Sequence, residues 1–138
     1  MPEHRNRIRT LVVDDSNLFR EAIKSYLEAQ KDIDLIGLVD SGKQCLEFIN
    51  KHNLHLIIMD VRMSGMDGPE TTRELKKNHP NIQVIICTVW ADQEARSYAS
   101  QSGADDYFVK GEPLSVLLRK IKSLFPSYRQ LHIFVKPQ

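Results

Sequence analysis

Five polar side chains stand at the ends of aliphatic runs, and their types suit the binding of a cation and a phosphoryl group. Asp14 and Asp15 follow one run, Asp60 and Thr88 end two others, and Lys110 ends a shorter fourth. Crowded carboxylates either raise a pKa or bind a cation, and Mg²⁺ favours carboxylate oxygens together with waters and phosphate. A carboxylate can also act as a nucleophile and form an aspartyl phosphate. The hydroxyl and the ammonium would then bind the phosphoryl oxygens and neutralise charge.

These side chains meet only if the chain builds a parallel sheet. Continuous apolar strands are typical of a parallel sheet covered by helices on both faces. The carboxyl ends of such strands share one edge, and ligands bind in the crevice outside it. Apolar runs predict strands over 8–13, 34–39, 56–60, 82–89 and 107–110. Apolar residues at helical spacing predict a helix after each strand. Alternating strands and helices imply an α/β fold with right-handed crossovers.

Capping residues delimit the expected helices. Ser16 or Asp15 suits the first N-cap, and Ser41 followed by Gln44 has the signature of a capping box. Pro69 suits the first turn of the third helix. The fourth helix is expected over 92–102, and the fifth from residue 113 to a stop at 126.

Size and composition indicate one small globular domain. The chain has 138 residues, 41% of them hydrophobic, and a formal net charge of +1. This charge gives no broad attraction to nucleic acid or membrane, and no segment is long and apolar enough to span a bilayer. Cys45 and Cys87 lie within apolar patterns, so we expect buried thiols in a reducing compartment. We therefore expect a cytoplasmic protein with a domain over 8–125 and a C-terminal extension or linker start over 126–138.

In their order along the chain, these residues resemble the receiver domain of bacterial response regulators. The resemblance rests on Asp14-Asp15, on Asp60 within the segment 59–68, on Thr88 and on Lys110. It covers roughly residues 8–125. It implies a flavodoxin-like, doubly wound three-layer sandwich with five parallel strands in the order 2-1-3-4-5.

The resemblance also implies a metal site beside a phosphoacceptor. Asp60 would be the phosphoacceptor. Asp15 and Asp60 would bind Mg²⁺, with Mn²⁺ as a substitute, together with the backbone carbonyl of Arg62. Asp14 would support the metal through water or through its charge.

The same resemblance implies a switch. Thr88 and Lys110 would bind the phosphoryl oxygens. Tyr107 matches the aromatic residue that turns inward when the hydroxyl of Thr88 moves. An aromatic residue in a strand is just as often a core residue, so both interpretations of Tyr107 remain open.

The implied partners are a sensor histidine kinase or a phosphotransfer protein. The chain would catalyse only its own phosphorylation and dephosphorylation, and its output would be binding. One output is a homodimer, formed either through the fourth helix, fifth strand and fifth helix or through the fifth helix and tail. Gly111, directly after Lys110, resembles the residue found at this place in receivers of the LuxR/NarL type. This resemblance suggests that the chain controls transcription through a DNA-binding domain absent from this chain. We expect no direct contact of this chain with nucleic acid or membrane.

Other functions remain open. The chain could be a stand-alone receiver, or a pseudo-receiver that never carries phosphate. A hydrolase of the haloacid dehalogenase type is disfavoured, because Arg62 stands where such enzymes carry a second aspartate. Val89 and Trp90 depart from the family pattern after Thr88, and we hypothesise that with Arg62 they slow attack by water on the phosphorylated form.

Overall fold

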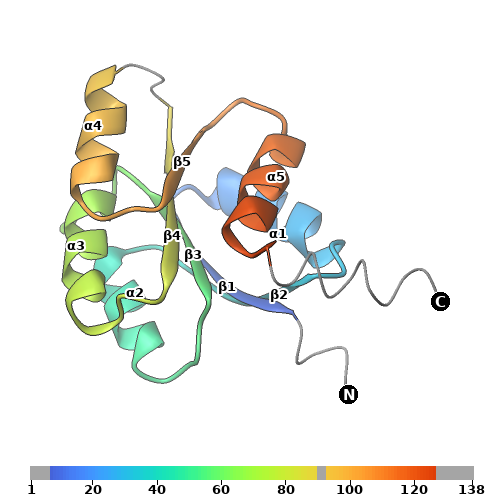
Figure 1. Cartoon of the computed structure of the whole chain (residues 1–138), viewed down its shortest axis with the longest axis horizontal. Helices are drawn as coiled ribbons and strands as arrows, with labels where there is room; N and C mark the ends of the chain where they lie inside the picture. The colour runs from blue at the N-terminus through green and yellow to red at the C-terminus, as the bar shows by residue number, and fades with distance from the viewer. Residues whose placement is uncertain (1–6, 90–92, 127–138) are drawn as a thin grey trace.

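Within residues 7–89 and 93–126, which the structure describes, five parallel strands form one sheet in the order β2-β1-β3-β4-β5 (Figure 1). The structure is a computed structural model. The strands are β1 (Ile8–Val13), β2 (Ile33–Val39), β3 (Leu56–Asp60), β4 (Gln83–Thr88) and β5 (Asp106–Val109). The helices are α1 (Asn17–Glu28), α2 (Gly42–Ile49), α3 (Gly68–Asn78), α4 (Gln93–Gln101) and α5 (Leu114–Leu124). The α/β fold and the strand order predicted from the sequence are confirmed.

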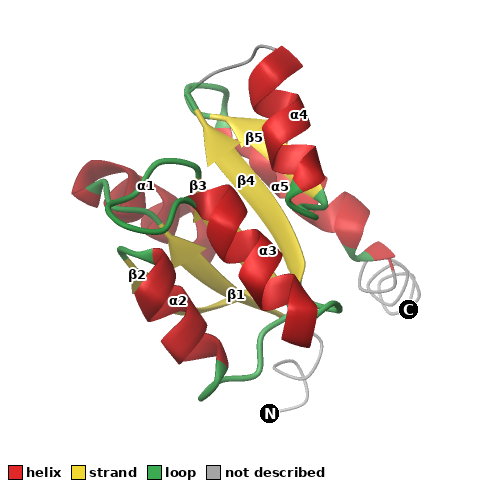
Figure 2. Ribbon diagram, turned by 90° about the vertical axis from the view of Figure 1, so that its left-hand side faces the viewer, coloured by secondary structure: helices red, strands yellow, loops and turns green. Residues whose placement is uncertain are grey.

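Helices cover both faces of the sheet. Figure 2 shows α2, α3 and α4 on one face, with α1 and α5 behind. Alternate residues of each strand enter different cores, because side chains on a strand point to opposite faces. Leu11, Met59 and Ile86 pack toward α2, α3 and α4. Val12 and Ile58 pack toward α1 and α5. This double burial explains why the sequence shows continuous apolar runs.

Two strands end earlier than predicted, and both ends lie beside the site. The fourth strand was expected to continue to Val89 but ends at Thr88, and Val89 is 63% exposed. The fifth was expected to include Lys110 but ends at Val109. Lys110 instead forms an isolated bridge to Glu112. The pairing of β4 with β5 ends at Thr88 and Val109, one residue before each predicted strand end.

The first turns of the helices are held by side chains. Ser16 caps α1 by accepting a hydrogen bond from the backbone N–H of Phe19. Ser41 caps α2, but Gln44 accepts from Asp40 N instead of Ser41 N, so the predicted capping box is incomplete. A complete box opens α3, where Asp67 and Glu70 accept from each other's backbone N–H.

The proposed extension over 126–138 lies outside the described residues apart from Pro126, so the domain boundaries stay predictions. Across 7–89 and 93–126, none of the helices combines the length and apolarity needed to cross a membrane.

Candidate functional site

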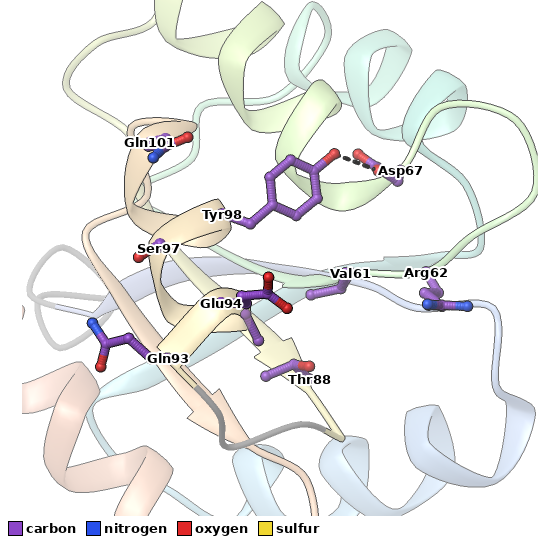
Figure 3. A pocket seen from close by; sticks show the side chains of 10 residues that line it. Val61, Arg62, Asp67, Thr88, Gln93, Glu94, Ser97, Tyr98 and Gln101 are labelled. Atoms are coloured by element: carbon purple, nitrogen blue, oxygen red, sulfur yellow. Dashed lines mark hydrogen bonds between the residues drawn. The ribbon is translucent and has the colours of Figure 1, made fainter.

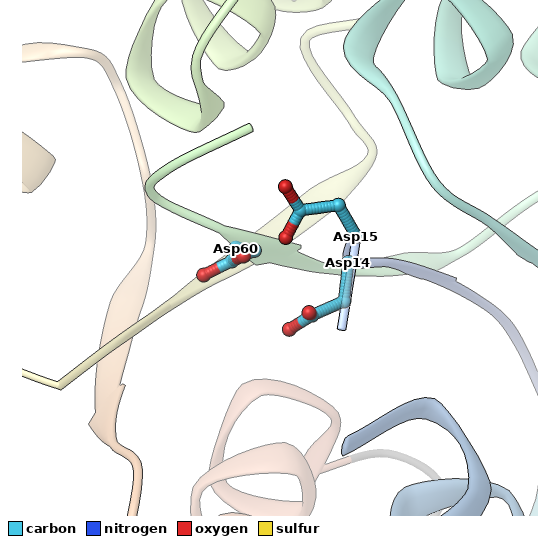
Figure 4. A group of neighbouring side chains, drawn as sticks. All are labelled: Asp14, Asp15 and Asp60. Atoms are coloured by element: carbon cyan, nitrogen blue, oxygen red, sulfur yellow. The ribbon is translucent and has the colours of Figure 1, made fainter. Parts of the chain in front are cut away.

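Three carboxylates converge at the carboxyl edge of the sheet. Asp14 and Asp15 follow β1, and Asp60 ends the adjacent β3. One carboxylate oxygen of each lies within 4.8 Å of the others (Figure 4). The parallel pairing of β1 and β3 produces this proximity, because it brings the ends of both strands to the same level.

The three carboxylates differ in exposure. Asp14 is 1% exposed and Asp60 is 8% exposed, whereas Asp15 is open to solvent. Oδ1 of Asp14 accepts a hydrogen bond of 2.8 Å from the backbone N–H of Ser16. The guanidinium of Arg20 donates to the backbone carbonyl of Asp14. The start of α1 therefore holds the acidic loop in place.

Lys110 provides the positive charge at this edge. Its Nζ lies 2.7 Å from Oδ2 of Asp14 and 3.2 Å from Oδ1 of Asp60. Nζ also lies 4.4 Å from the centre of the Phe19 ring. Burial acts to lower the pKa of Lys110, but the two carboxylates outweigh this effect and raise the pKa. The side chain therefore remains a cation.

The charge on Lys110 does not balance the carboxylates. Burial and the charge of Asp14 raise the pKa of Asp60 to about 6, although Lys110 opposes this shift. Oδ2 of Asp14 is buried, and apart from the Lys110 ion pair it has no hydrogen-bond donor among the described residues. Three clustered carboxylates with one ammonium leave an excess of negative charge, which fits a divalent cation such as Mg²⁺.

The loop after Asp60 is tightly closed. Val61 N donates to Cys87 O (3.1 Å), and Gly68 N donates to Val61 O (2.8 Å). Gly68 packs against the backbone carbonyl of Asp60, where a Cβ would overlap it. Arg62 lies within this loop, two residues after Asp60. The loop therefore returns to the strand end before α3 begins.

Thr88 and Lys110 lie at the ends of neighbouring strands. Thr88 is 4% exposed, and its carbonyl accepts from Lys110 N at 2.7 Å. Tyr107 lies near the start of β5, where it pairs with Ile86. Its ring is flanked by the cations of Arg96 from α4 and Lys120 from α5, each 4.9 Å from the ring centre. Tyr107 therefore lies in the layer beneath the edge, between two helices.

A pocket of about 780 Å³ adjoins the site (Figure 3). Residues from the β3–α3 loop, the end of β4 and α4 line it, among them Arg62, Asp67, Thr88 and Tyr98. Tyr98 donates a hydrogen bond of 2.8 Å to Oδ2 of Asp67 across this pocket. Exposed Val89 stands beside Thr88, whereas Trp90 lies outside the described residues.

Reasoning from the sequence missed three residues that shape the site. Phe19 and Arg20 lie in α1, and Gly68 is the first residue of α3. The Asp67–Glu70 spacing around Pro69 was a signal for the tight start of α3. No local signal connects Phe19 with Lys110, because their contact joins distant parts of the chain.

Residues 10–122 match the family model of the response regulator receiver domain. The chain belongs to this family. The receiver is 37% identical over 118 residues to the response regulator protein VraR of Staphylococcus saprophyticus, covering 86% of this chain and 56% of VraR. It is 32% identical over 131 residues to the response regulator GacA of Pseudomonas aeruginosa, covering 95% of this chain and 59% of GacA. The receiver thus spans little more than half the length of these relatives.

A solved structure agrees with this assignment. It is a DNA-binding response regulator of the LuxR family from Staphylococcus aureus, with a TM-score of 0.79 and 26% identity. The match covers 85% of this chain and 98% of that one. Receiver domains of two-component systems bind Mg²⁺ at an acidic pocket and interact with histidine kinases or phosphotransfer proteins. In this receiver Asp14, Asp15 and Asp60 form a cluster of carboxylates at the carboxyl edge of the sheet.

Proposed function

We propose that this receiver accepts a phosphoryl group on Asp60 from a histidine kinase or a phosphotransfer protein. The observation that carries the proposal is the position of Asp60, which lies within 4.8 Å of two other carboxylates and 3.2 Å from Lys110. A nucleophilic carboxylate needs its negative charge offset as the phosphoryl group approaches. Asp60 therefore has both a cation site and an ammonium beside it.

In the proposed step, a carboxylate oxygen of Asp60 bonds to the phosphorus of phosphohistidine. The phosphorus–nitrogen bond breaks, and its electron pair returns to the imidazole of the donor. Asp15, Asp60 and the backbone carbonyl of Arg62 would hold Mg²⁺, with Asp14 in support. The bound ion supplies neutralisation of charge on the phosphoryl oxygens. Lys110 and Thr88 donate hydrogen bonds to the remaining oxygens.

The proposed output is a change in binding. Movement of the Thr88 hydroxyl toward the phosphoryl group would free space for Tyr107, whose ring contacts Arg96 and Lys120. Such a local change biases a two-state element. The surface of α4, β5 and α5 would then bind a second copy of the receiver, with α5 and the tail as another candidate face.

We further propose that the full regulator controls transcription. Support comes from the relatives, which extend well beyond the matched part, and from the DNA-binding response regulator among the solved neighbours. The receiver itself would act only on its own phosphorylation state and would leave DNA contact to another domain.

The test is incubation with Mg²⁺ and acetyl phosphate, followed by the mass of the intact protein. The proposal predicts one added phosphoryl group, with acetate as the leaving group, and none for Asp60→Asn. Asp40→Asn is the matched control, since Asp40 is an exposed aspartate just after β2 at the same edge. Absence of any adduct would favour a pseudo-receiver. Rapid donor consumption without an adduct would favour a hydrolase.

A further inference from the structure

The ammonium of Lys110 has an aromatic neighbour as well as two carboxylates. Nζ lies 4.4 Å from the centre of the Phe19 ring, within the range of a cation–π interaction. It lies 2.7 Å from Asp14 and 3.2 Å from Asp60. The Lys110 side chain is only 16% exposed, so water does little to weaken these contacts.

The position of Phe19 is coupled to the same carboxylate that pairs with Lys110. Oδ1 of Asp14 accepts from Ser16 N, and Oγ of Ser16 accepts from Phe19 N. The Phe19 ring packs against the core beneath α1 and α5. Oδ2 of Asp14 pairs with Lys110, whose ammonium meets the ring. These contacts form a closed ring that runs from Asp14 through Ser16, Phe19 and Lys110 back to Asp14.

This ring of contacts can hold the Lys110 ammonium in position when Lys110 changes its hydrogen-bond partners. Lys110 has three N–H donors, and two of them face the carboxylates of Asp14 and Asp60. When Asp60 carries a phosphoryl group, the N–H that faces its carboxylate turns toward a phosphoryl oxygen. A lysine side chain is flexible and loses its position easily when contacts are exchanged. The face of an aromatic ring attracts the ammonium without requiring one particular N–H direction. The contact with Phe19 can therefore persist while the N–H groups turn from carboxylate to phosphoryl oxygens.

We propose that Phe19 is a positioning residue for the reaction at Asp60, holding the Lys110 ammonium through the exchange of its partners. This inference rests on the proposed function. If Phe19 were only a core residue, its apolar volume would matter and the electron density of its ring would not.

The first experiment tests the contact without any phosphorylation. Phe19→Leu, Lys110→Met and the double variant are unfolded in urea. Phe19→Leu should raise the equilibrium constant of unfolding in both backgrounds. We expect this increase to be roughly two- to fivefold smaller when Lys110 is already replaced by methionine. Phe48→Leu is the control, since Phe48 is a half-buried helical phenylalanine on the opposite face of the sheet. Additive effects of Phe19→Leu and Lys110→Met would overturn the inference.

The second experiment tests the role in the reaction. Mono-, di- and trifluorinated phenylalanine are placed at position 19, because fluorination weakens the ring's attraction for a cation while nearly preserving its shape. We expect the maximal rate of phosphorylation by acetyl phosphate to fall with each fluorine, roughly two- to fivefold over the series. The half-saturating donor concentration should stay constant. The same series at Phe48 should leave the rate unchanged.

The outcomes separate the inference from the proposed function. A flat series at position 19, with normal phosphorylation of Asp60, would overturn the role of Phe19 alone. If the unsubstituted protein accepts no phosphoryl group, the proposed function is wrong and the positioning role falls with it. The unfolding experiment would then still report whether the ring and the ammonium interact.

Discussion

Gly68 packs against the backbone carbonyl of Asp60, with no room for a side chain between them. The contact joins the first residue of α3 to the last residue of β3. The hydrogen bond from Gly68 N to Val61 O holds it closed. The start of α3 therefore determines where the backbone of the proposed phosphoacceptor lies.

Replacing Gly68 by alanine should disturb both stability and the site. The added methyl group must displace backbone atoms, and we expect a loss of about 1–3 kcal/mol in the free energy of unfolding. Displacement of Asp60 should also slow phosphorylation by acetyl phosphate. Gly65→Asn is the control in the same loop, because Gly65 has open space at its Cβ position and asparagine tolerates its φ of +78°. Equal stability of Gly68→Ala and wild type would contradict the packing argument.

The raised pKa of Asp60 predicts a pH-dependent stability in the absence of metal. Its pKa is about 6 in the folded protein, against the ordinary value of 3.8. The folded protein therefore binds a proton on Asp60 more tightly than the unfolded chain does. This contribution is fully present below about pH 4 and is lost as the pH rises through about 6.

Urea unfolding in a chelator measures this contribution. Asp60→Asn cannot titrate, so its stability relative to wild type should increase as the pH rises from about 4 to about 7. Added Mg²⁺ should reduce the increase, because a bound cation stabilises the ionised carboxylate. The difference in the free energy of unfolding between wild type and Asp60→Asn could instead stay constant across this range. In that case, burial and the charge of Asp14 do not raise the pKa of Asp60.

The exposed position of Asp15 gives a clean test of the metal site. Because Asp15 is open to solvent, Asp15→Asn should fold like wild type. Saturating Mg²⁺ should stabilise wild type, by about 2.7 kcal/mol at a concentration one hundred times the Kd. We expect Asp15→Asn to lose most of this gain in thermal unfolding, and Asp40→Asn to keep it. A gain of the same size in Asp15→Asn would remove Asp15 from the metal site.

The hydrogen bond between Tyr98 and Asp67 can be detected by titration. This bond to a carboxylate, with smaller effects of burial and nearby acids, raises the pKa of Tyr98. Asp67→Asn removes the charge but can still cap α3, so the pKa of Tyr98 should fall toward the ordinary value. Glu70→Gln should lower it less, because Glu70 acts only through its charge at longer range. NMR or absorbance titration of tyrosine distinguishes these cases, and an unchanged Tyr98 in Asp67→Asn would argue against the bond.

The sheet and the convergence of the acids follow from local patterns. Continuous apolar runs arise because β1, β3 and β4 are covered on both faces, and each run ends where the polar residues begin. Parallel pairing then brings Asp14 and Asp60 together. The apolar runs and the parallel arrangement of the strands together predict the edge of the sheet at which the acidic residues meet.

Features that depend on specific tertiary contacts were not predictable in the same way. Val89 and Lys110 were assigned to strands, because residue type does not reveal where ladder partners stop. The bond from Asp40 N to Gln44 depends on the course of the backbone before α2, which the capping-box signature does not encode. The contact of Phe19 with Lys110 crosses the sheet edge and depends on the packing of α1.

The most direct test of the central claim is to locate the phosphoryl group on the chain. After incubation with Mg²⁺ and acetyl phosphate, borohydride reduces an aspartyl phosphate to the corresponding alcohol, and peptide mass spectrometry identifies the modified residue. We predict reduction at Asp60 and at neither Asp14 nor Asp15. A phosphorylated protein whose modification maps to any residue other than Asp60 would contradict the account.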